Sequence, residues 1–138
     1  MFCKIIYLSL QSSQKVSFMK SLNYIKVEDG IIEAKLDVLS YVEDGVFFVF
    51  APALDLTGYG NSLEEAKTSF EITLQEYFKY TFENKTLDAD LRKHGWVEKK
   101  EESFSSPSFT DILRKDKQLR DIVNNDYTKV SEQFSYSF

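Results

Sequence analysis

Few residues in this chain are of the types that catalyse reactions or bind transition metals. His94 is the only histidine and Cys3 is the only cysteine among 138 residues. A hydrolytic triad needs a nucleophile beside a histidine base, and a zinc site needs several histidine or cysteine ligands. One histidine and one remote cysteine do not supply these parts. We expect His94, at the predicted end of a helix, to interact with the last carbonyl groups of that helix.

Carboxylates are numerous, and the question is whether they converge on a metal ion. A β-meander followed by a helix begins the RNase H fold, whose nucleases hold divalent ions with several convergent carboxylates. Asp37 and Glu33 share a predicted solvated strand face, but Lys35 lies between them. The other candidates lie on the polar side and first turn of a predicted helix: Glu64, Glu65, Glu71 and Glu76. Surface roles explain each of them, and a metal-dependent nuclease is the minor alternative. We therefore predict no catalytic residue, no metal site and no cofactor.

Two further patterns suggest ligand binding at first sight. Gly58-Tyr59-Gly60 lacks the third glycine of a dinucleotide fingerprint and the Gly-Lys-Ser/Thr of a phosphate-binding loop, so we interpret it as a tight turn before a helix. Tyr77, Phe78, Tyr80 and Phe82 can form a stacking platform for bases. The helical spacing of Phe78 and Phe82 favours a place in the core instead, and only Tyr80 is expected to face elsewhere.

The charge balance is acidic. The chain has 17 Lys and Arg against 22 Asp and Glu, a net charge of −5 and a pI of about 4.9. A protein that grips phosphates carries a basic face or stripe. The densest basic segments are Lys99-Lys100, which has acidic neighbours on both sides, and Arg114-Lys115-Lys117, on a mixed-charge helix. Direct nucleic-acid binding is therefore not expected, whereas an acidic surface suits a basic partner.

Length and aromatic content indicate one folded domain. We expect residues 21–138 to form a single α+β domain, with a helix-strand extension at 104–138, and residues 1–20 to be a loosely held arm or a late-packing strand. Met19 is an alternative start. The apolar run Ile5–Leu10 is shorter than the roughly 7–15 residues of a signal-peptide core, and no apolar run reaches the roughly 18 of a membrane span. With a single cysteine, we expect a cytoplasmic protein.

The central region predicts a three-stranded antiparallel meander. Strands are expected at 24–27, 32–42 and 46–50, with Glu-Asp-Gly at both connections. Asp-Gly between apolar runs is a strong hairpin signal, because glycine supplies the positive φ of a tight primed turn. Pro52 ends the third strand. Residues 54–59 are expected to be a connector, with or without a short edge strand.

The later region predicts mainly helices. Ser62 begins a capping box, and apolar residues at spacings of three and four predict a long helix over 62–83, which packs on the sheet through Phe70, Leu74 and Phe78. A short helix is expected at 87–93, with Trp96 folding back on the core. A polar connector at 98–106 and one or two helices over 109–123 follow. Strict alternation at 134–138, with Val130 in phase, predicts a strand that completes this sheet or pairs with another chain.

The order of these elements and the residues between them suggest a family. The third strand is followed by Ala51-Pro52-Ala53-Leu54, a short loop to Tyr59-Gly60-Asn61-Ser62, and Leu63-Glu64-Glu65-Ala66 at the start of the helix. This succession resembles the HicB antitoxin domain, whose hallmark is strand, Pro-x-Leu, loop, Gly-Asp/Asn-Thr/Ser and x-Glu-Glu-Ala. The resemblance covers residues 31–96, about half of the chain.

The resemblance implies a partial RNase H-like fold without the nuclease carboxylates. It also implies a function, namely binding and blocking a small basic HicA-type toxin that cleaves RNA. The segment Leu54-Asp55-Leu56-Thr57 departs from the common Leu-Pro-Gly-Cys of the family. Residues 104–138 are predicted as helix then strand, which is the wrong order for the ribbon-helix-helix that binds operator DNA in many members. Operator binding is therefore not predicted.

We expect an antitoxin-type binding protein that is not an enzyme. The alternative is a solitary HicB-like protein that has no toxin and assembles with itself, through the C-terminal strand, in a structural or regulatory role. Exposed polar connectors on a rigid scaffold are the places to look for a partner site. The predicted partner-binding residues are Glu43, Asp44, Asp55, Tyr59 and Asn61, with Tyr59 as the anchor and the Glu43-Asp44 turn as steering charge.

Overall fold

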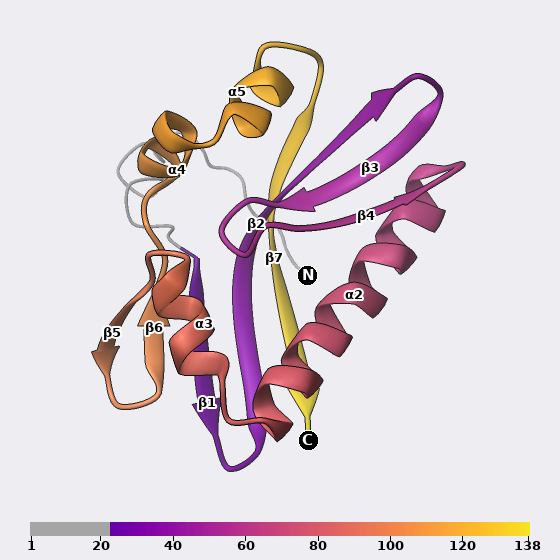
Figure 1. The fold of residues 1–138 in the computed structure, drawn as a ribbon. Coiled ribbons are helices and arrows are strands. Elements are labelled where there is room, and N and C mark those ends of the chain that lie inside the picture. The colour runs from indigo at the N-terminus through magenta and orange to yellow at the C-terminus, as the bar shows by residue number, and fades with distance from the viewer. Residues whose placement is uncertain (1–22) are drawn as a thin grey trace, which may run out of the picture.

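The computed structural model describes residues 23–138, so the predicted arm at 1–20 and the alternative start at Met19 lie outside the described part of the chain. The described residues form an α+β fold in which seven strands make one antiparallel sheet and four helices pack around it (Figure 1). The predicted fold class, an antiparallel meander with a long helix on one face, is confirmed. Between residues 23 and 138 no helix is long and apolar enough to cross a membrane.

The elements follow one another in a mostly local order. The strands are β1 (Tyr24–Glu28), β2 (Ile31–Glu43), β3 (Val46–Ala51), β4 (Leu56–Gly60), β5 (Val97–Lys100), β6 (Ser103–Ser105) and β7 (Thr128–Ser137). The helices are α2 (Leu63–Glu83), α3 (Leu87–Lys93), α4 (Phe109–Lys115) and α5 (Lys117–Val123). The sheet runs β4-β3-β2-β1-β6-β5, and β7 pairs with β2.

β2 has partners along both of its edges. Its residues 31–35 pair with both β1 and β7, and its residues 39–40 pair with both β3 and β7. A strand residue has one neighbour on each edge, so β1 and β3 share one edge while β7 occupies the other. Between the ends of β1 and β3, the backbone N–H of Asp37 donates to the side-chain oxygen of Asn23. The buried Asn23 amide also donates to the Ser106 hydroxyl and so fills the gap in the ladder.

Two Asp-Gly turns connect the first three strands. Asp29 and Gly30 have φ values of 53° and 75°, and Asp44 and Gly45 have φ values of 53° and 79°. Positive φ at both central residues is the mark of the primed turn whose twist matches a two-residue hairpin. Both predicted hairpins are confirmed.

α2 packs on the sheet face that carries the even-numbered side chains of β2. The Ser62 hydroxyl accepts the Glu65 N–H at 3.1 Å, and the Glu65 carboxylate reaches back to accept the Asn61 N–H at 2.9 Å. This reciprocal cap stabilises the first turn. The buried stripe of the helix is Ala66, Phe70, Leu74, Phe78 and Thr81, which confirms the predicted contact face.

The segment after Pro52 is more regular than a connector. β4 forms the edge of the sheet beside β3, and Gly58 and Gly60 both lie within it. A Cβ atom at Gly58 would stand 2.2 Å from the backbone nitrogen of Phe70, and one at Gly60 would stand 2.5 Å from the Cβ of Glu65. Interpreting these glycines as a turn was therefore wrong. They let α2 approach the backbone of β4 closely.

The opposite face of the sheet is covered in part by α4 and α5. The predicted helical region at 109–123 forms two short helices, because the Asp116 carboxylate caps the second by accepting the Leu119 N–H at 3.2 Å. A small core gathers on this face, made of Leu39, Phe50, Leu119 and Ile122. Asp37 was expected on a solvated face of β2 with Glu33 and Lys35, but it is half-buried, because the fully buried Leu39 on the same face draws α4 and α5 over this part of the strand.

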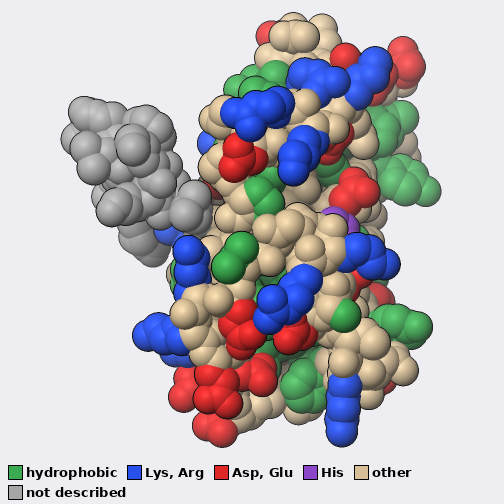
Figure 2. Space-filling view, turned by 60° about the vertical axis from the view of Figure 1, so that its left-hand side comes forward, with side chains coloured by type: hydrophobic (Ala, Val, Ile, Leu, Met, Phe, Trp, Pro, Cys, Tyr) green, Lys and Arg blue, Asp and Glu red, His purple; other side chains and the backbone are tan. Residues whose placement is uncertain are grey.

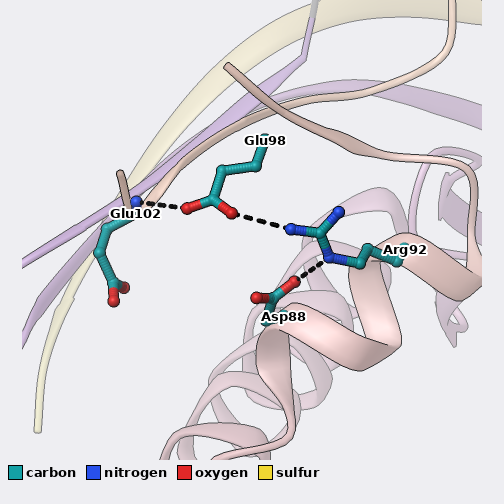
Figure 3. Close-up of polar contacts among 4 residues, drawn as sticks. All are labelled: Asp88, Arg92, Glu98 and Glu102. Carbon is teal, nitrogen blue, oxygen red and sulfur yellow. Dashed lines mark hydrogen bonds and ion pairs between the residues drawn. The ribbon is translucent and has the colours of Figure 1, made fainter. Parts of the chain in front are cut away.

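Residues 98–106 form a hairpin rather than the predicted polar connector. β5 and β6 pair with each other, and β6 extends the sheet beyond β1. Figure 3 shows how polar side chains hold this hairpin to α3: Arg92 contacts Asp88 within the helix and donates to Glu98 at 2.8 Å, while Glu98 accepts the Glu102 N–H. Trp96 folds back on the core as predicted and donates to the Ala53 carbonyl at 2.8 Å.

The predicted C-terminal strand is longer than its alternating core of 134–138. β7 begins at Thr128, and ten of its residues pair with β2. Its even-numbered side chains meet α2 through the ring pairs Phe70–Phe134, Phe78–Tyr136 and Phe82–Phe138. Of the two predicted placements, the structure shows the strand completing its own sheet (Figure 1).

Candidate protein-binding surface

Three aromatic side chains form a row across neighbouring strands on the face opposite α2. Strand register places Tyr41 of β2 opposite Phe48 of β3, and Phe48 opposite Tyr59 of β4. The rings of Tyr41 and Phe48 stack with centroids 5.1 Å apart, and those of Phe48 and Tyr59 lie 6.4 Å apart. Tyr59 is 65% exposed. This aromatic row (Tyr41, Phe48, Tyr59) is a rigid apolar surface, because each ring stands on a paired strand.

An acidic groove borders the aromatic row. It is an open hollow of about 780 Å³ between the β2–β3 turn and α5. Its charged lining is Glu43, Asp44, Asp121, Asp126 and Lys117. Four carboxylates stand against one ammonium, a formal balance of −3, and Lys117 already contacts Asp121 at 3.0 Å. The groove is therefore suited to positively charged side chains.

One wall of the acidic groove is the end of β2, which pairs with β3 on one edge but has no strand partner on the β7 edge within residues 23–138. The last β2–β7 pair is Ser40 with Thr128, so β2 continues for three residues beyond its neighbour. The Phe138 N–H donates to the Gly30 carbonyl, and residues with mutual hydrogen bonds alternate along an antiparallel ladder. Even-numbered residues of β2 therefore direct their backbone N–H and C=O groups toward β7. Val42, beyond the end of β7, presents its own N–H and C=O on this edge. Val42 is exposed and lines both the groove and an adjoining hollow of about 600 Å³.

Tyr41 joins the aromatic row to the groove. Burial raises the pKa of its hydroxyl above the ordinary value, a hydrogen bond with Gln118 of α5 lowers it, and the neighbouring Glu43 raises it further. The hydroxyl is therefore protonated at neutral pH. Tyr41 therefore adds a neutral hydrogen-bonding group to the lining of the groove.

The structure brings together four of the five predicted partner-binding residues. Glu43, Asp44, Tyr59 and Asn61 lie at the same end of the β2–β3–β4 meander, because β4 ends beside the start of β3. Asp55 precedes β4 and lies at the other end, roughly 20 Å away at about 3.3 Å per residue. Asp55 has φ of 57° in the turn between β3 and β4, so its backbone conformation serves that turn.

Sequence reasoning missed several residues of this surface. Tyr41 and Phe48 follow from the Asp44-Gly45 turn, because a two-residue hairpin that pairs Glu43 with Val46 also pairs Tyr41 with Phe48. The register signal was therefore present in the sequence. Asp121 and Asp126 gave no such signal, since only the packing of α5 against Leu39 brings them to the end of β2.

The carboxylates of the described residues do not gather into a metal site. No group of three or more His, Cys, Asp or Glu side chains in residues 23–138 is placed to hold a metal ion. Burial raises the pKa of Asp37, and the charges nearest to it are those of Lys129 and Lys35, which lower the pKa. The Nδ1 atom of His94 lies 2.9 Å from the Asp90 carbonyl oxygen in the last turn of α3, which confirms the predicted contact with helix carbonyls.

Charge on the face that carries α3, the β5–β6 hairpin and α4 is mixed. Figure 2 shows Lys and Arg side chains interspersed with Asp and Glu over this face, without a continuous stripe of either sign. The predicted basic segments take part in this mixture: Arg114 pairs with Asp111 at 3.0 Å. The acidic groove thus differs from this face in carrying a clear excess of one sign.

Comparisons with protein families, with curated proteins and with solved structures find no match for this chain.

Proposed function

We propose that this chain is an antitoxin-type binding protein of the HicB kind, which occludes a small basic HicA-type RNA-cleaving toxin by binding it rather than by catalysis. The observation that carries the proposal is the aromatic row beside the acidic groove. Residues 31–96, which resemble HicB in sequence, contribute all three rings and two of the four groove carboxylates.

The surface has the composition of an interface centre. Tyrosine is enriched among residues that dominate binding energy, and such anchors work best on a rigid base within a partly polar rim. Tyr59 is exposed, but its neighbour Phe48 and the strand ladder limit its motion. Carboxylates around such an anchor attract a basic partner and hold it in register, since complementary charge raises association rates.

The test begins with the native partner. Full-length tagged protein is used to isolate bound proteins from the source cell, and the neighbouring reading frame is expressed as a candidate; a short, basic product is expected. Tyr59→Ala should weaken binding by about 30-fold, the roughly 2 kcal/mol of an interface anchor. Tyr80→Ala is the matched control, because Tyr80 is 67% exposed on α2, on the other face of the sheet.

A double change, Glu43→Gln with Asp44→Asn, completes the test. It should slow association and flatten the salt dependence while changing residence time little. Asparagine tolerates the positive φ of Asp44, so the turn is preserved. If Tyr59→Ala and the double variant stay folded and bind with the affinity and salt slope of the wild type, the proposed surface is wrong.

A second candidate function is a solitary HicB-like protein that assembles with itself in a structural or regulatory role. The observation in its favour is the outer edge of β7, which has no strand partner within residues 23–138. The two functions differ in what the neighbouring reading frame encodes. A basic product that binds the chain supports the antitoxin role, and its absence supports the solitary role.

A further inference from the structure

The outer edge of β7 carries a regular row of unpaired backbone groups. The β2–β7 ladder keeps one register from Gly30, whose carbonyl accepts the Phe138 N–H at 2.8 Å, to Ser40 opposite Thr128. Even-numbered residues of β7 therefore bond to β2, and odd-numbered residues direct their N–H and C=O outward. The outward set is Lys129, Ser131, Gln133, Ser135 and Ser137. None of them has a strand partner in the described part of the chain.

This edge has few of the features by which proteins prevent sheet edges from pairing. Natural proteins protect edges with short strands, proline, β-bulges or charged side chains. β7 is ten residues long, contains no proline and pairs with β2 without a register shift. Its charged residues are Lys129, which stands near the start of the strand and lies over the Phe109 ring, and Glu132, which is half-buried beside Lys67 of α2. The edge is therefore a template for another strand.

The side chains of β7 are complementary to those of a second, antiparallel β7. A two-fold axis at Phe134 places Phe134 opposite its own copy and Val130, which is 44% exposed, opposite Phe138 on the α2 face. Glu132 then faces the Tyr136 hydroxyl of the second copy. On the other face, Gln133 opposes Ser135. No like charges meet, and cross-strand aromatic and β-branched pairs stabilise a sheet.

We infer that two copies of this chain form a two-fold symmetric dimer in which their β7 strands pair antiparallel about Phe134 and join the two sheets into one. The contact strip comprises residues 130–138 of each copy and is roughly 31 Å long for these nine residues and about 20 Å deep when the α2 layer is included. The resulting area, about 600 Å² per copy, is at the lower end of the range of standard stable interfaces, which bury roughly 600–1,000 Å² per partner.

The dimer does not rest on toxin binding. Each acidic groove includes Asp126, two residues before β7 begins, so the axis at Phe134 places the two grooves toward opposite ends of the shared strand pair. A dimer thus presents two separate partner surfaces. The mass of the particle tests the inference without a partner, so it can fail while the proposed binding function stands, and the reverse also holds.

The first experiment measures mass in solution by light scattering and sedimentation equilibrium. The full chain should have twice its 16.1 kDa mass at high concentration and dissociate reversibly on dilution. Ser135→Pro removes one outward N–H without touching the β2 ladder and should weaken the dimer by at least tenfold. Ser135→Ala keeps that N–H and should stay dimeric. A wild type that is monomeric at every concentration, or a folded Ser135→Pro that dimerises as the wild type does, overturns the inference.

A second pair of variants tests the register and replaces the proline variant if that one does not fold. Gln133→Lys with Ser135→Lys puts like charges opposite each other across the axis and should give a monomer that dimerises again at high salt. Gln133→Lys with Ser135→Glu puts opposite charges there and should remain dimeric. Far-ultraviolet circular dichroism and the fluorescence of buried Trp96 report whether each variant is folded. Equal masses for the two variants at low salt would show that β7 does not pair in this way.

Discussion

Asn23 and Asp37 lie at the gap between β1 and β3 along one edge of β2. The N–H of Asp37 falls in the gap between β1 and β3, and the side chain of Asn23 accepts it. Asn23 is itself buried with its amide bound to Ser106, so this polar position is fully satisfied. Among residues 23–138, the Asp37 carboxyl has no such hydrogen-bond partner. Its pKa is raised because burial disfavours the charged form more than Lys129 and Lys35 favour it.

Asp37→Asn should therefore change how stability depends on pH. A raised folded-state pKa means that the folded protein holds this proton more tightly than the unfolded chain, whose pKa is near 3.8. Stability from this group is greatest below pH 3.8 and is lost as pH rises through the folded pKa. The variant, which mimics the protonated form, should gain stability over the wild type as pH rises through that window and keep the gain at neutral pH.

Urea unfolding of both proteins at a series of pH values from pH 3 to pH 7 measures this difference in the free energy of unfolding. Asp126→Asn, at an exposed aspartate, is the matched control. A variant that is less stable than the wild type at neutral pH would show that the two lysines outweigh burial.

At the scale of elements, the position of α2 depends on the lack of side chains in β4. The Gly58 Cα lies so close to the helix that an added Cβ would stand 2.5 Å from the Cα of Phe70 and 2.8 Å from the Ala66 carbonyl oxygen. These are backbone atoms, which cannot rotate away. The helix also carries Phe70 and Phe78, which are fully buried against the sheet and β7. Any shift of α2 therefore disturbs the main core.

Gly58→Ala should destabilise the protein by about 3 kcal/mol or more, at or above the usual cost of overpacking a core. Gly45→Ala is the control. A Cβ at Gly45 meets nothing within 4 Å, and its φ of +79° alone should cost about 1–2 kcal/mol. Chemical denaturation of the two variants gives both values. If Gly58→Ala costs no more than Gly45→Ala, the helix is not held as closely to β4 as the structure shows.

At the scale of the whole molecule, β2 joins two cores that lie on opposite faces of the sheet. Leu36 and Val38 belong to the main core under α2, and Leu39 belongs to the small core under α4 and α5. Adjacent residues of one strand thus serve different layers, as the alternation of a strand requires. Losing either layer exposes β2, so the two cores should unfold together.

Leu119→Ala tests this cooperativity. Leu119 is fully buried in the small core, and its truncation should cost about 2–5 kcal/mol. Trp96, the only tryptophan, lies in the main core, so its fluorescence reports on the other layer. Both fluorescence and far-ultraviolet circular dichroism should shift to the same lower midpoint. Ile72→Ala, at an exposed position of α2, should shift neither. A fluorescence midpoint that stays at the wild-type value would mean that the α4–α5 layer unfolds independently.

Local chemistry made several elements predictable from the sequence alone. Asp44-Gly45 specifies a primed turn because glycine reaches positive φ without strain, and the register of β2 and β3 follows from that turn. Ser62 and Glu65 mark the start of α2, and the spacing of Phe70, Leu74 and Phe78 marks its buried face. Each of these signals acts over a few residues, so it survives without knowledge of the fold.

Contacts between distant residues decided the rest. β4 and the β5–β6 hairpin have little strand character of their own, and pairing with β3 and β1 makes them strands. Gly58 was interpreted as a turn residue from its type and its neighbours. Its actual constraint is the backbone of α2, which leaves no room for a Cβ atom at this position. The acidic groove joins the Glu43-Asp44 turn to Asp121 and Asp126, far along the chain. Proximity of this kind depends on packing across the sheet, which no spacing in the sequence records.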